Sequence, residues 1–551
     1  MDATNLTLYE VVEQRAKTDP NLKALYYQGK KISYRKFLKL IDKAADVLYY
    51  ELGIRKGDVI LIAQPNIPDT LILFYAVNKI GAIANMVHPF TPYNQIREIM
   101  RKTNTKLAFL FEQRIAKEVE KYRLIADKVI VTRVEDYLPC LKKMMYHTFM
   151  NTAIRKKLSK HRKFKGFTYF HQLKHKGHKH IEKVNGDFIH ETAVLLHSGS
   201  TTGDPKTIML PCSGFNYSVS HAYEYLSIKD QDESVKGYAM LGILPSFHGF
   251  GLCITMHASF YLGFTLALIP KFSNKAAIDA INHNKMGAII GTPNVFESLL
   301  KDKGFTNNKR IKYLLACYAG GDSLNLAIKQ RFDAVLEKQG AKARLFEGYG
   351  LTESISVVIV NTHAHNKFGS IGYPSSGMDI KILDENNKEV NTNEIGEICV
   401  KSKTNMIGYF NDPEATKAAV IDGYLHTGDL GYVDEDGFIF FKQRKKRVVK
   451  VSGVGVFPSE IEHLIETIPG VEGCCAIQIP DSKLNSAIKV FVVAKYFDEE
   501  GMRHDIMETC QKYLIRWAVP KEIEFRKELP RTLLGKIDFK VLQKEEDEKR
   551  K

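Results

Sequence analysis

The chain has 551 residues, which is too long for one ordinary domain and suggests three or four. With 44% hydrophobic and 26% charged residues it has the composition of a soluble globular protein with large cores, and its formal net charge is +16. The eight cysteines include no Cys-x-x-Cys pair and residues 1–5 do not begin a secretion signal, so we expect a reducing, cytoplasmic location without a disulfide framework.

The first two hundred residues alternate helical and strand patterns. Ser33 is a candidate cap for a helix whose apolar residues recur at helical spacing. These residues are Phe37, Ile41, Ala44 and Leu48. Strands are expected at 59–63, 83–87 and 106–111, with an apolar helix at 71–80. Strands that alternate with helices of this length predict a parallel sheet covered on both faces.

The positive charge is concentrated in residues 142–183, which hold 13 Lys and Arg residues against Glu182 alone, and so carry 12 of the 16 net charges. Six histidines also lie there, but their irregular spacing among lysines argues against metal binding. Three interpretations stay open, namely a solvated insertion, a nucleic-acid patch and a basic amphipathic segment on an anionic membrane. The apolar lead-in that starts at Leu141 has no use in phosphate binding, so we expect no nucleic-acid partner.

The alternation resumes with strands expected at 192–196, 287–291 and 313–317. Between them, residues 241–270 pass without a Lys, Arg, Asp or Glu, which resembles a membrane span. Pro245 and several glycines and histidines interrupt this run. We therefore expect a buried turn, helix and strand there.

The pattern changes after residue 369. Alternating polar and apolar residues at 379–383 and 397–401 predict antiparallel strands. Later, 458–468 and 503–517 have helical patterns and 488–495 a strand pattern. The predicted fold is α/β. It has a large N-terminal domain of doubly wound sheets, residues 1–443. This domain includes the basic insertion 142–183 and a small β-barrel-like antiparallel subdomain at about 369–443. A small mobile α+β domain, residues 444–551, follows.

Two segments point to a nucleotide triphosphate. The Ser/Thr/Gly-rich loop 198–206 would surround phosphate oxygens with backbone N–H and hydroxyl groups. It is not a Walker P-loop, because Pro205 stands before Lys206 and removes a backbone donor. In the second segment, 348–353, an acidic residue follows a Gly-x-Gly turn and would hold the accompanying magnesium ion.

Further motifs follow in a fixed order: His426-Thr427-Gly428-Asp429, Arg444 with Lys446, Ser452-Gly453, Pro458-Ser459-Glu460-Ile461-Glu462 and Pro530 to Ile537. With the two phosphate segments, this series resembles the adenylate-forming superfamily of acyl-CoA synthetases, luciferases and peptide-synthetase adenylation domains. The resemblance covers residues 5–545. It implies that a carboxylate attacks the α-phosphate of ATP to form an acyl-AMP, and that a thiol then displaces AMP.

The resemblance also implies a role for each site residue. The β- and γ-phosphates would be wrapped by Thr201, Thr202, Gly203 and Lys206, while Thr352 would lie by the α-phosphate and Glu353 would bind Mg²⁺. The adenine pocket would be lined by Gly321, Asp322, Ser323, Tyr349 and Gly350. Asp429, assisted by Arg444, would bind the ribose hydroxyls, and Lys536 would reach the oxygen between carboxylate and α-phosphate. His248 matches a position beside the acyl pocket, with a satisfied core histidine as the alternative.

Members of the superfamily rotate the small domain between half-reactions. The hinge residue aligns with Lys446, and the rotation would bring Lys450, Ser452 and Gly453 to coenzyme A. Three positions depart from the family pattern, since Ser200, Thr207 and Gln443 stand where relatives usually have glycine. None of the three removes a charged catalytic group.

The acid is less well defined by the sequence. The preferred hypothesis is an ATP- and Mg²⁺-dependent ligase that joins a medium- or long-chain fatty acid to coenzyme A, with peripheral membrane contact through 142–183. Two alternatives stay open. One is an aryl- or amino-acid-activating ligase that loads a carrier-protein thiol. The other is a non-catalytic membrane-surface protein that retains the fold.

Overall fold

The computed structural model describes residues 3–149, 167–173, 180–181, 188–198, 206–229, 232–355, 357–481, 484–495, 498–531 and 537–550. The chain forms two compact units: the large unit, Met1–Asp379 with Lys401–Leu425, and the small unit, Ile380–Val400 with His426–Lys551. This grouping differs from the boundary expected after residue 443, because the strands before that residue group with the C-terminal part. The boundary expected after residue 443 marks where the C-terminal domain would rotate during the reaction, and that boundary stays a prediction.

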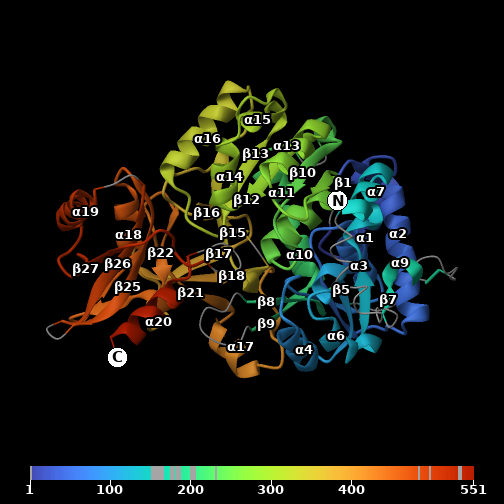
Figure 1. Ribbon diagram of the computed structural model, residues 1–551, viewed down its shortest axis with the longest axis horizontal. Coiled ribbons are helices and arrows are strands. Elements are labelled where there is room, and N and C mark those ends of the chain that lie inside the picture. The colour runs from blue at the N-terminus through green and yellow to red at the C-terminus, as the bar shows by residue number, and fades with distance from the viewer. Residues whose placement is uncertain are drawn as a thin grey trace. The chain divides into compact units, whose positions relative to one another are not determined.

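The large unit contains two sheets (Figure 1). The strands of the first sheet, in spatial order, are β16 (Tyr373–Pro374), β15 (Val357–Val360), β14 (Leu345–Gly350), β13 (Ala316–Gly320), β12 (Lys285–Gly291), β10 (Tyr238–Gly242), β11 (Thr265–Leu268), β1 (Lys23–Tyr27) and β2 (Lys30–Ser33). Those of the second are β19 (Gly408–Tyr409), β9 (Thr207–Pro211), β8 (Thr192–His197), β4 (Ile83–Met86), β3 (Val59–Ala63), β5 (Thr105–Phe111), β6 (Val129–Thr132) and β7 (Thr168–Tyr169). The central strands of both sheets are parallel, as the alternating pattern predicts.

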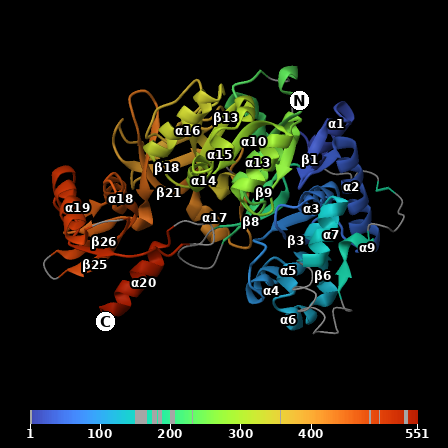
Figure 2. The ribbon, with the colours of Figure 1, turned by 45° about the horizontal axis from the view of Figure 1, so that its top comes forward.

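Helices fill the space between these two sheets and cover their outer faces. The α-helices of the large unit are α1 (Leu8–Thr18), α2 (Tyr34–Asp46), α3 (Pro68–Lys79), α4 (Tyr93–Lys102), α5 (Glu112–Ile115), α6 (Val119–Arg123), α7 (Cys140–Phe149), α9 (Phe170–Leu173), α10 (Cys212–Ser220), α11 (Ala222–Tyr225), α12 (Ala258–Leu262), α13 (Asn274–His283), α14 (Pro293–Leu300), α15 (Lys303–Thr306), α16 (Leu326–Lys338) and α17 (Pro413–Ala419). Helices α13, α14 and α16 lie against β12 to β14, and α4 and α5 against β5 (Figures 1 and 2).

The period of two along each strand decides which core receives each side chain. In β3, Ile60 and Ile62 join the central core with α1, α2, α3, α10 and α12, whereas Leu61 joins the outer core under α4. In β10, Met240 faces the central core and Leu241 faces the core under α13, α14 and α16. Strands with both faces buried explain the nearly continuous apolar runs in the sequence.

The charge-free run 241–270 folds as expected into a buried turn, helix and strand. It continues from β10 through a π-helix (Phe250–His257) and α12 into β11. Within the described part of the chain, no helix has both the length and the hydropathy that a membrane span requires.

The small unit combines antiparallel strands with an α+β part. Its elements are β17 (Asp379–Leu383), β18 (Gly396–Lys401), β21 (Tyr424–Val433), β22 (Ile439–Arg444), β23 (Val449–Val451), β24 (Val454–Val456), α18 (Pro458–Glu466), β25 (Val471–Asp481), β26 (Asn485–Ala494), α19 (Glu499–Tyr513), β27 (Glu522–Phe525) and α20 (Phe539–Lys549). The first residue of β17, the last of β18 and the first two of β21 belong to the large unit, as does the whole of β20 (Val420–Ile421), which pairs with β21. Strands β25, β26 and β27 form one sheet, which packs against α18 on one side and α20 on the other.

Candidate active site

The carboxyl ends of neighbouring parallel strands bring the predicted adenine-pocket residues together. Gly320 at the end of β13 lies opposite Gly348 in β14, so the turn that begins at Gly321 lies at the same edge of the sheet as Tyr349 and Gly350, the last residues of β14. Gly321 has a φ of +82°, which suits glycine. Ligands of α/β sheets bind at such carboxyl edges.

His248 lies on the turn after β10, close to the segment that carries Thr352 and Glu353. The Nδ1 atom of His248 accepts from the N–H of Phe250 at 3.3 Å, so the proton of the neutral ring is on Nε2. A Cβ atom on Gly249 would lie 1.8 Å from the carbonyl oxygen of Ile355, so only glycine allows this approach. Ile355 itself is buried with a φ of +66°, a strained conformation for a β-branched residue.

The stem of the phosphate loop is held by hydrogen bonds between its two sides. The N–H of Ser198 donates to the carbonyl of Lys206 at 2.9 Å, and the N–H of Lys206 donates to the Ser198 hydroxyl at 3.0 Å. At the next pair of residues, one position farther from the loop, the Thr207 hydroxyl lies 3.2 Å from Nδ1 of His197. Thr201, Thr202 and Gly203 lie outside the described residues.

A tyrosine joins the two predicted phosphate-site charges. The Tyr409 hydroxyl donates to Oε1 of Glu353 at 3.2 Å, and the ammonium of Lys206 lies 4.2 Å from the centre of the Tyr409 ring. Sequence reasoning missed Tyr409, because no spacing or charge marks it. Only the pairing of β19 with β9 brings it beside Lys206.

The residues around Glu353 fit a nucleotide-borne Mg²⁺. Among the described residues, no group of three or more His, Cys, Asp and Glu side chains could cage a metal ion. Mg²⁺ that arrives with a nucleotide needs only one or two protein carboxylates, because phosphates and waters complete its shell. Glu353 supplies one carboxylate, and its bond to Tyr409 leaves other lone pairs for a cation.

Glu347 is a second residue that sequence reasoning missed. It precedes Gly348 on β14, and burial raises the pKa of its carboxyl to about 7. Perturbed carboxyls are common at functional sites, and the only signal in the sequence was an acidic residue inside a strand pattern.

An apolar cavity opens beside these strand ends. It has a volume of about 30 Å³, and Phe250 and Gly348 border it on the side of the His248 turn. Its walls include Met240, Ile254 and Leu262, and its accessible lining is apolar. The lining therefore suits an apolar group rather than a charged one.

In the small unit, Asp429 and Arg444 lie opposite each other on β21 and β22. The Nε atom of Arg444 is 3.3 Å from Oδ1 of Asp429, and Asp429 is buried while Arg444 is exposed. The Asp429 backbone is fixed by the Thr427 hydroxyl, which accepts from its N–H at 3.1 Å and donates to the Ile398 carbonyl at 2.7 Å. A carboxylate held beside a guanidinium suits recognition of a diol.

The predicted hinge and coenzyme A residues also belong to the small unit. Lys446 lies in a short 3-10 turn directly after β22 and is exposed. Lys450, Ser452 and Gly453 are exposed on the hairpin of β23 and β24, whose turn has φ values of +49° and +83°. Lys536 lies outside the described residues, but its loop closes through a bridge between Arg531 and Ile537.

Comparison with known proteins adds to this geometry. Residues 12–410 match the model of the AMP-binding enzyme family, and residues 460–536 match the model of the AMP-binding enzyme C-terminal domain. A long-chain-fatty-acid–CoA ligase of Bacillus subtilis (strain 168) is 32% identical over 556 residues, covering 99% of this chain and 95% of its own.

Two solved structures share the fold. The anthranilate CoA ligase AuaEII in complex with anthranoyl-AMP is 21% identical, with a TM-score of 0.81 and 99% of each chain covered. The o-succinylbenzoate coenzyme A synthetase of Bacillus subtilis, in complex with ATP and magnesium, is 22% identical, with a TM-score of 0.79, 97% of this chain and 99% of that chain covered. The chain therefore belongs to the AMP-binding enzyme family and is an adenylate-forming acid–thiol ligase.

Proposed function

We propose that the protein joins a medium- or long-chain fatty acid to coenzyme A at the expense of ATP. The observation that carries this proposal is the apolar cavity that opens beside Gly348 and Phe250. An alkyl chain needs an apolar lining of this kind, and side chains would have to move to widen the small cavity for it. The carboxylate of the acid would then lie near Tyr349 and the His248 turn. The 32% identical relative named as a long-chain-fatty-acid–CoA ligase supports the same substrate class.

In the first half-reaction the acid becomes acyl-AMP and pyrophosphate leaves. Thr201, Thr202, Gly203 and Lys206 hold the β- and γ-phosphates, and Thr352 lies by the α-phosphate. The adenine site is lined by Gly321, Asp322, Ser323, Tyr349 and Gly350. The ribose is bound by Asp429 with Arg444. Glu353 would hold Mg²⁺, which would supply neutralisation of the phosphate charge. Lys536 stabilises the negative charge that develops between carboxylate and α-phosphate.

In the second half-reaction the thiol of coenzyme A displaces AMP. Rotation of the C-terminal part about Lys446 withdraws Lys536 and brings in the hairpin with Lys450, Ser452 and Gly453. One site cannot serve both steps in one rigid conformation, so the exposed, short turn at Lys446 suits a hinge.

A panel of carboxylic acids tests this proposal. With ATP, Mg²⁺ and coenzyme A, AMP release should be highest with saturated acids of medium or long chain and low with anthranilate or amino acids. Lys536→Ala should lower pyrophosphate release about 10²- to 10³-fold, as the loss of a transition-state donor does elsewhere. Lys527→Ala, which changes an exposed lysine of the same unit, is the matched control.

The cavity has its own variant in the same panel. Ala222 lines it and is buried, so Ala222→Leu should move the preferred acid to shorter chains while octanoate turnover persists. Activity confined to aryl or amino acids, with transfer only to a phosphopantetheinylated carrier protein, would replace the fatty-acid proposal with the aryl- or amino-acid ligase. No turnover with any acid would leave the non-catalytic alternative.

We also propose that the protein contacts anionic membranes through residues 142–183. The supporting observation is α7, the described start of this segment, where Leu141, Met144 and Met145 are 67%, 62% and 53% exposed beside Lys142 and Lys143. Exposed apolar side chains among lysines suit the surface of an anionic bilayer.

A further inference from the structure

Tyr409 lies between the two charged side chains of the phosphate site, which come from different parts of the chain. Glu353 belongs to the 3-10 turn Thr352–Ser354, and Lys206 immediately precedes β9. The hydroxyl of Tyr409 donates to the Glu353 carboxylate at 3.2 Å, while the ring face lies 4.2 Å from the Lys206 ammonium. One side chain therefore contacts both a candidate metal ligand and a candidate phosphate ligand.

The backbone around Tyr409 is bonded to both neighbours as well. Strand β19 pairs with β9, with Tyr409 opposite Ile208, and the N–H of Phe410 donates to the carbonyl of Thr207 at 2.8 Å. The N–H of Met406 donates to the carbonyl of Glu353 at 2.7 Å. The segment 406–410 thus holds the two charged residues at fixed places relative to the ring.

The chemistry of the phenol matches both contacts. A phenol O–H is a hydrogen-bond donor and a carboxylate oxygen is an acceptor, as the contact of Tyr409 with Glu353 requires. The face of an aromatic ring carries negative electrostatic potential, which attracts an ammonium. The ring occupies one side of the Lys206 ammonium and leaves its N–H groups to point toward phosphate oxygens.

We infer that Tyr409 is a positioning residue for ATP and its magnesium ion: its hydroxyl orients the Glu353 carboxylate and its ring holds the Lys206 ammonium ready for the phosphates. The inference rests on the proposed use of ATP at this site. Both contacts persist when the nucleotide binds, so the two charges need no rearrangement, and affinity is higher than it would be with mobile side chains.

Two substitutions of Tyr409 distinguish the contribution of its hydroxyl from that of its ring. For both variants, ATP binding is measured by calorimetry in the absence of a carboxylic acid substrate. Tyr409→Phe keeps the ring and should raise the free Mg²⁺ concentration for half-maximal ATP affinity about tenfold, with unchanged ATP affinity in the absence of metal. Tyr409→Leu removes both contacts and should also weaken metal-free ATP binding several-fold.

Tyr424→Phe is the matched control, because the Tyr424 hydroxyl also donates to a carboxylate, that of Asp379, at an exposed place outside the phosphate site. The role of the hydroxyl is refuted if Tyr409→Phe and Tyr424→Phe have the same Mg²⁺ dependence as the wild type. The role of the ring is refuted if Tyr409→Leu, folded by its melting curve, binds metal-free ATP as well as or better than the wild type. A wild-type protein that binds no MgATP would instead overturn the proposed function.

Discussion

Thr207, at a position where the family resemblance predicts glycine, contacts His197. The ring of His197 is buried, and burial lowers its pKa to about 4, so it is neutral. Its Nε2–H donates to Oδ1 of Asn85 at 2.7 Å, and its Nδ1 accepts from the Thr207 hydroxyl. The departure from the family pattern thus adds a bond across the stem of the phosphate loop, next to Lys206.

Removing this hydroxyl tests its importance for ATP. Thr207→Val keeps the shape and the strand preference but leaves Nδ1 of His197 without its donor, so the KM for ATP should rise about tenfold. Thr207→Ser retains the hydroxyl and should restore the wild-type value. Steady-state kinetics with ATP as the varied substrate measure both variants, and an unchanged KM in Thr207→Val would show that the other stem bonds suffice.

At the residue scale, chemistry-bearing side chains were easier to predict than the residues that hold them. Lys206, Glu353 and Asp429 are marked in the sequence by glycines and by the order of the motifs, because phosphate and ribose need those residue types. Tyr409, His197 and Glu347 were not found, since local sequence does not show their contacts. Tyr409 pairs with β9 and His197 contacts Asn85, both distant in sequence, and Glu347 is buried by the packing of the whole unit.

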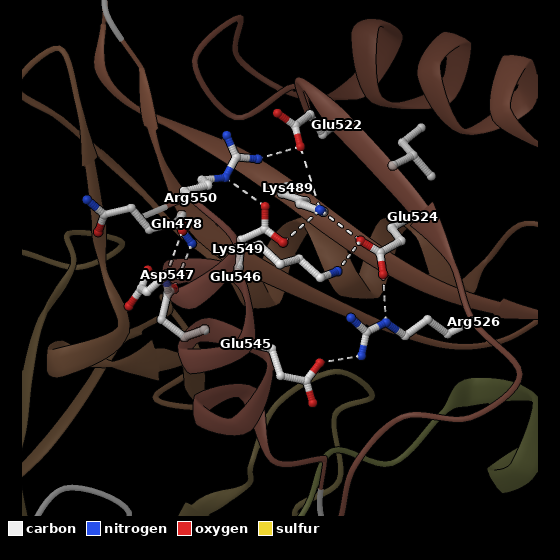
Figure 3. Close-up of polar contacts among 12 residues, drawn as sticks. Gln478, Lys489, Glu522, Glu524, Arg526, Glu545, Glu546, Asp547, Lys549 and Arg550 are labelled. Carbon is white, nitrogen blue, oxygen red and sulfur yellow. Dashed lines mark hydrogen bonds and ion pairs between the residues drawn. The ribbon is translucent and has the colours of Figure 1, made fainter.

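At the element scale, α20 follows the loop that carries Lys536 and is attached to its sheet by a network of ion pairs. The ammonium of Lys489 on β26 lies 2.8 Å from Glu546 on α20 and 2.8 Å from Glu524 on β27 (Figure 3). Arg526 adds a pair with Glu545 at 2.7 Å. The network holds α20 against its sheet.

Breaking this network should destabilise the small unit. Lys489→Met removes one of the two cations that pair with Glu546, which is 3% exposed and keeps its pair with Arg550. The substitution should lower the free energy of unfolding by about 2 kcal/mol. Lys495→Met, which breaks an exposed pair with Glu472, is the control and should change it by less than about 1 kcal/mol. Urea unfolding followed by circular dichroism measures both, and equal effects would contradict the proposed importance of the network.

The same network has a pH dependence. Partial burial favours the neutral form of Glu524, but Lys489 and Arg526 prevail and lower its pKa to about 2. The stabilisation by this carboxylate is therefore complete above its unfolded pKa of about 4.5 and is lost as the pH falls toward 2.

The sequence predicted the type and place of the strongly periodic elements closely, but it predicted the residues at which they begin and end less closely. The Ser33 cap was confirmed, since its hydroxyl accepts from the N–H of Lys36. The strand predicted at 313–317 begins only at Ala316, because Lys309–Tyr313 form a 3-10 turn capped by Asn308. The helix predicted at 503–517 runs from Glu499 to Tyr513, because Asp498 caps it earlier and Leu514 is extended.

At the scale of the whole molecule, exposed apolar residues on α7 lead to a prediction about vesicles. Each Met side chain withdrawn from water contributes about 1.5–3 kcal/mol, so Met144→Ser with Met145→Ser should lower binding to phosphatidylglycerol vesicles at least tenfold and spare ATP-dependent turnover. Leu124→Ser removes a residue that is 76% exposed outside this segment, and serves as the control. Sedimentation with vesicles measures binding, and equal binding of the double variant and the wild type would leave the segment without a membrane role.

The sequence by itself determined the α/β class and the family, and it predicts the charged groups of the nucleotide site. Periodicity is a local property, and the chemistry of phosphate, magnesium and ribose restricts which side chains can serve. Only the tertiary structure decided that alternate faces of β3 and β10 enter different cores, that Gly249 meets Ile355, and that Tyr409 joins Lys206 to Glu353. Such contacts depend on which strands become neighbours, and that choice follows from the packing of the whole unit rather than from any local stretch of the chain.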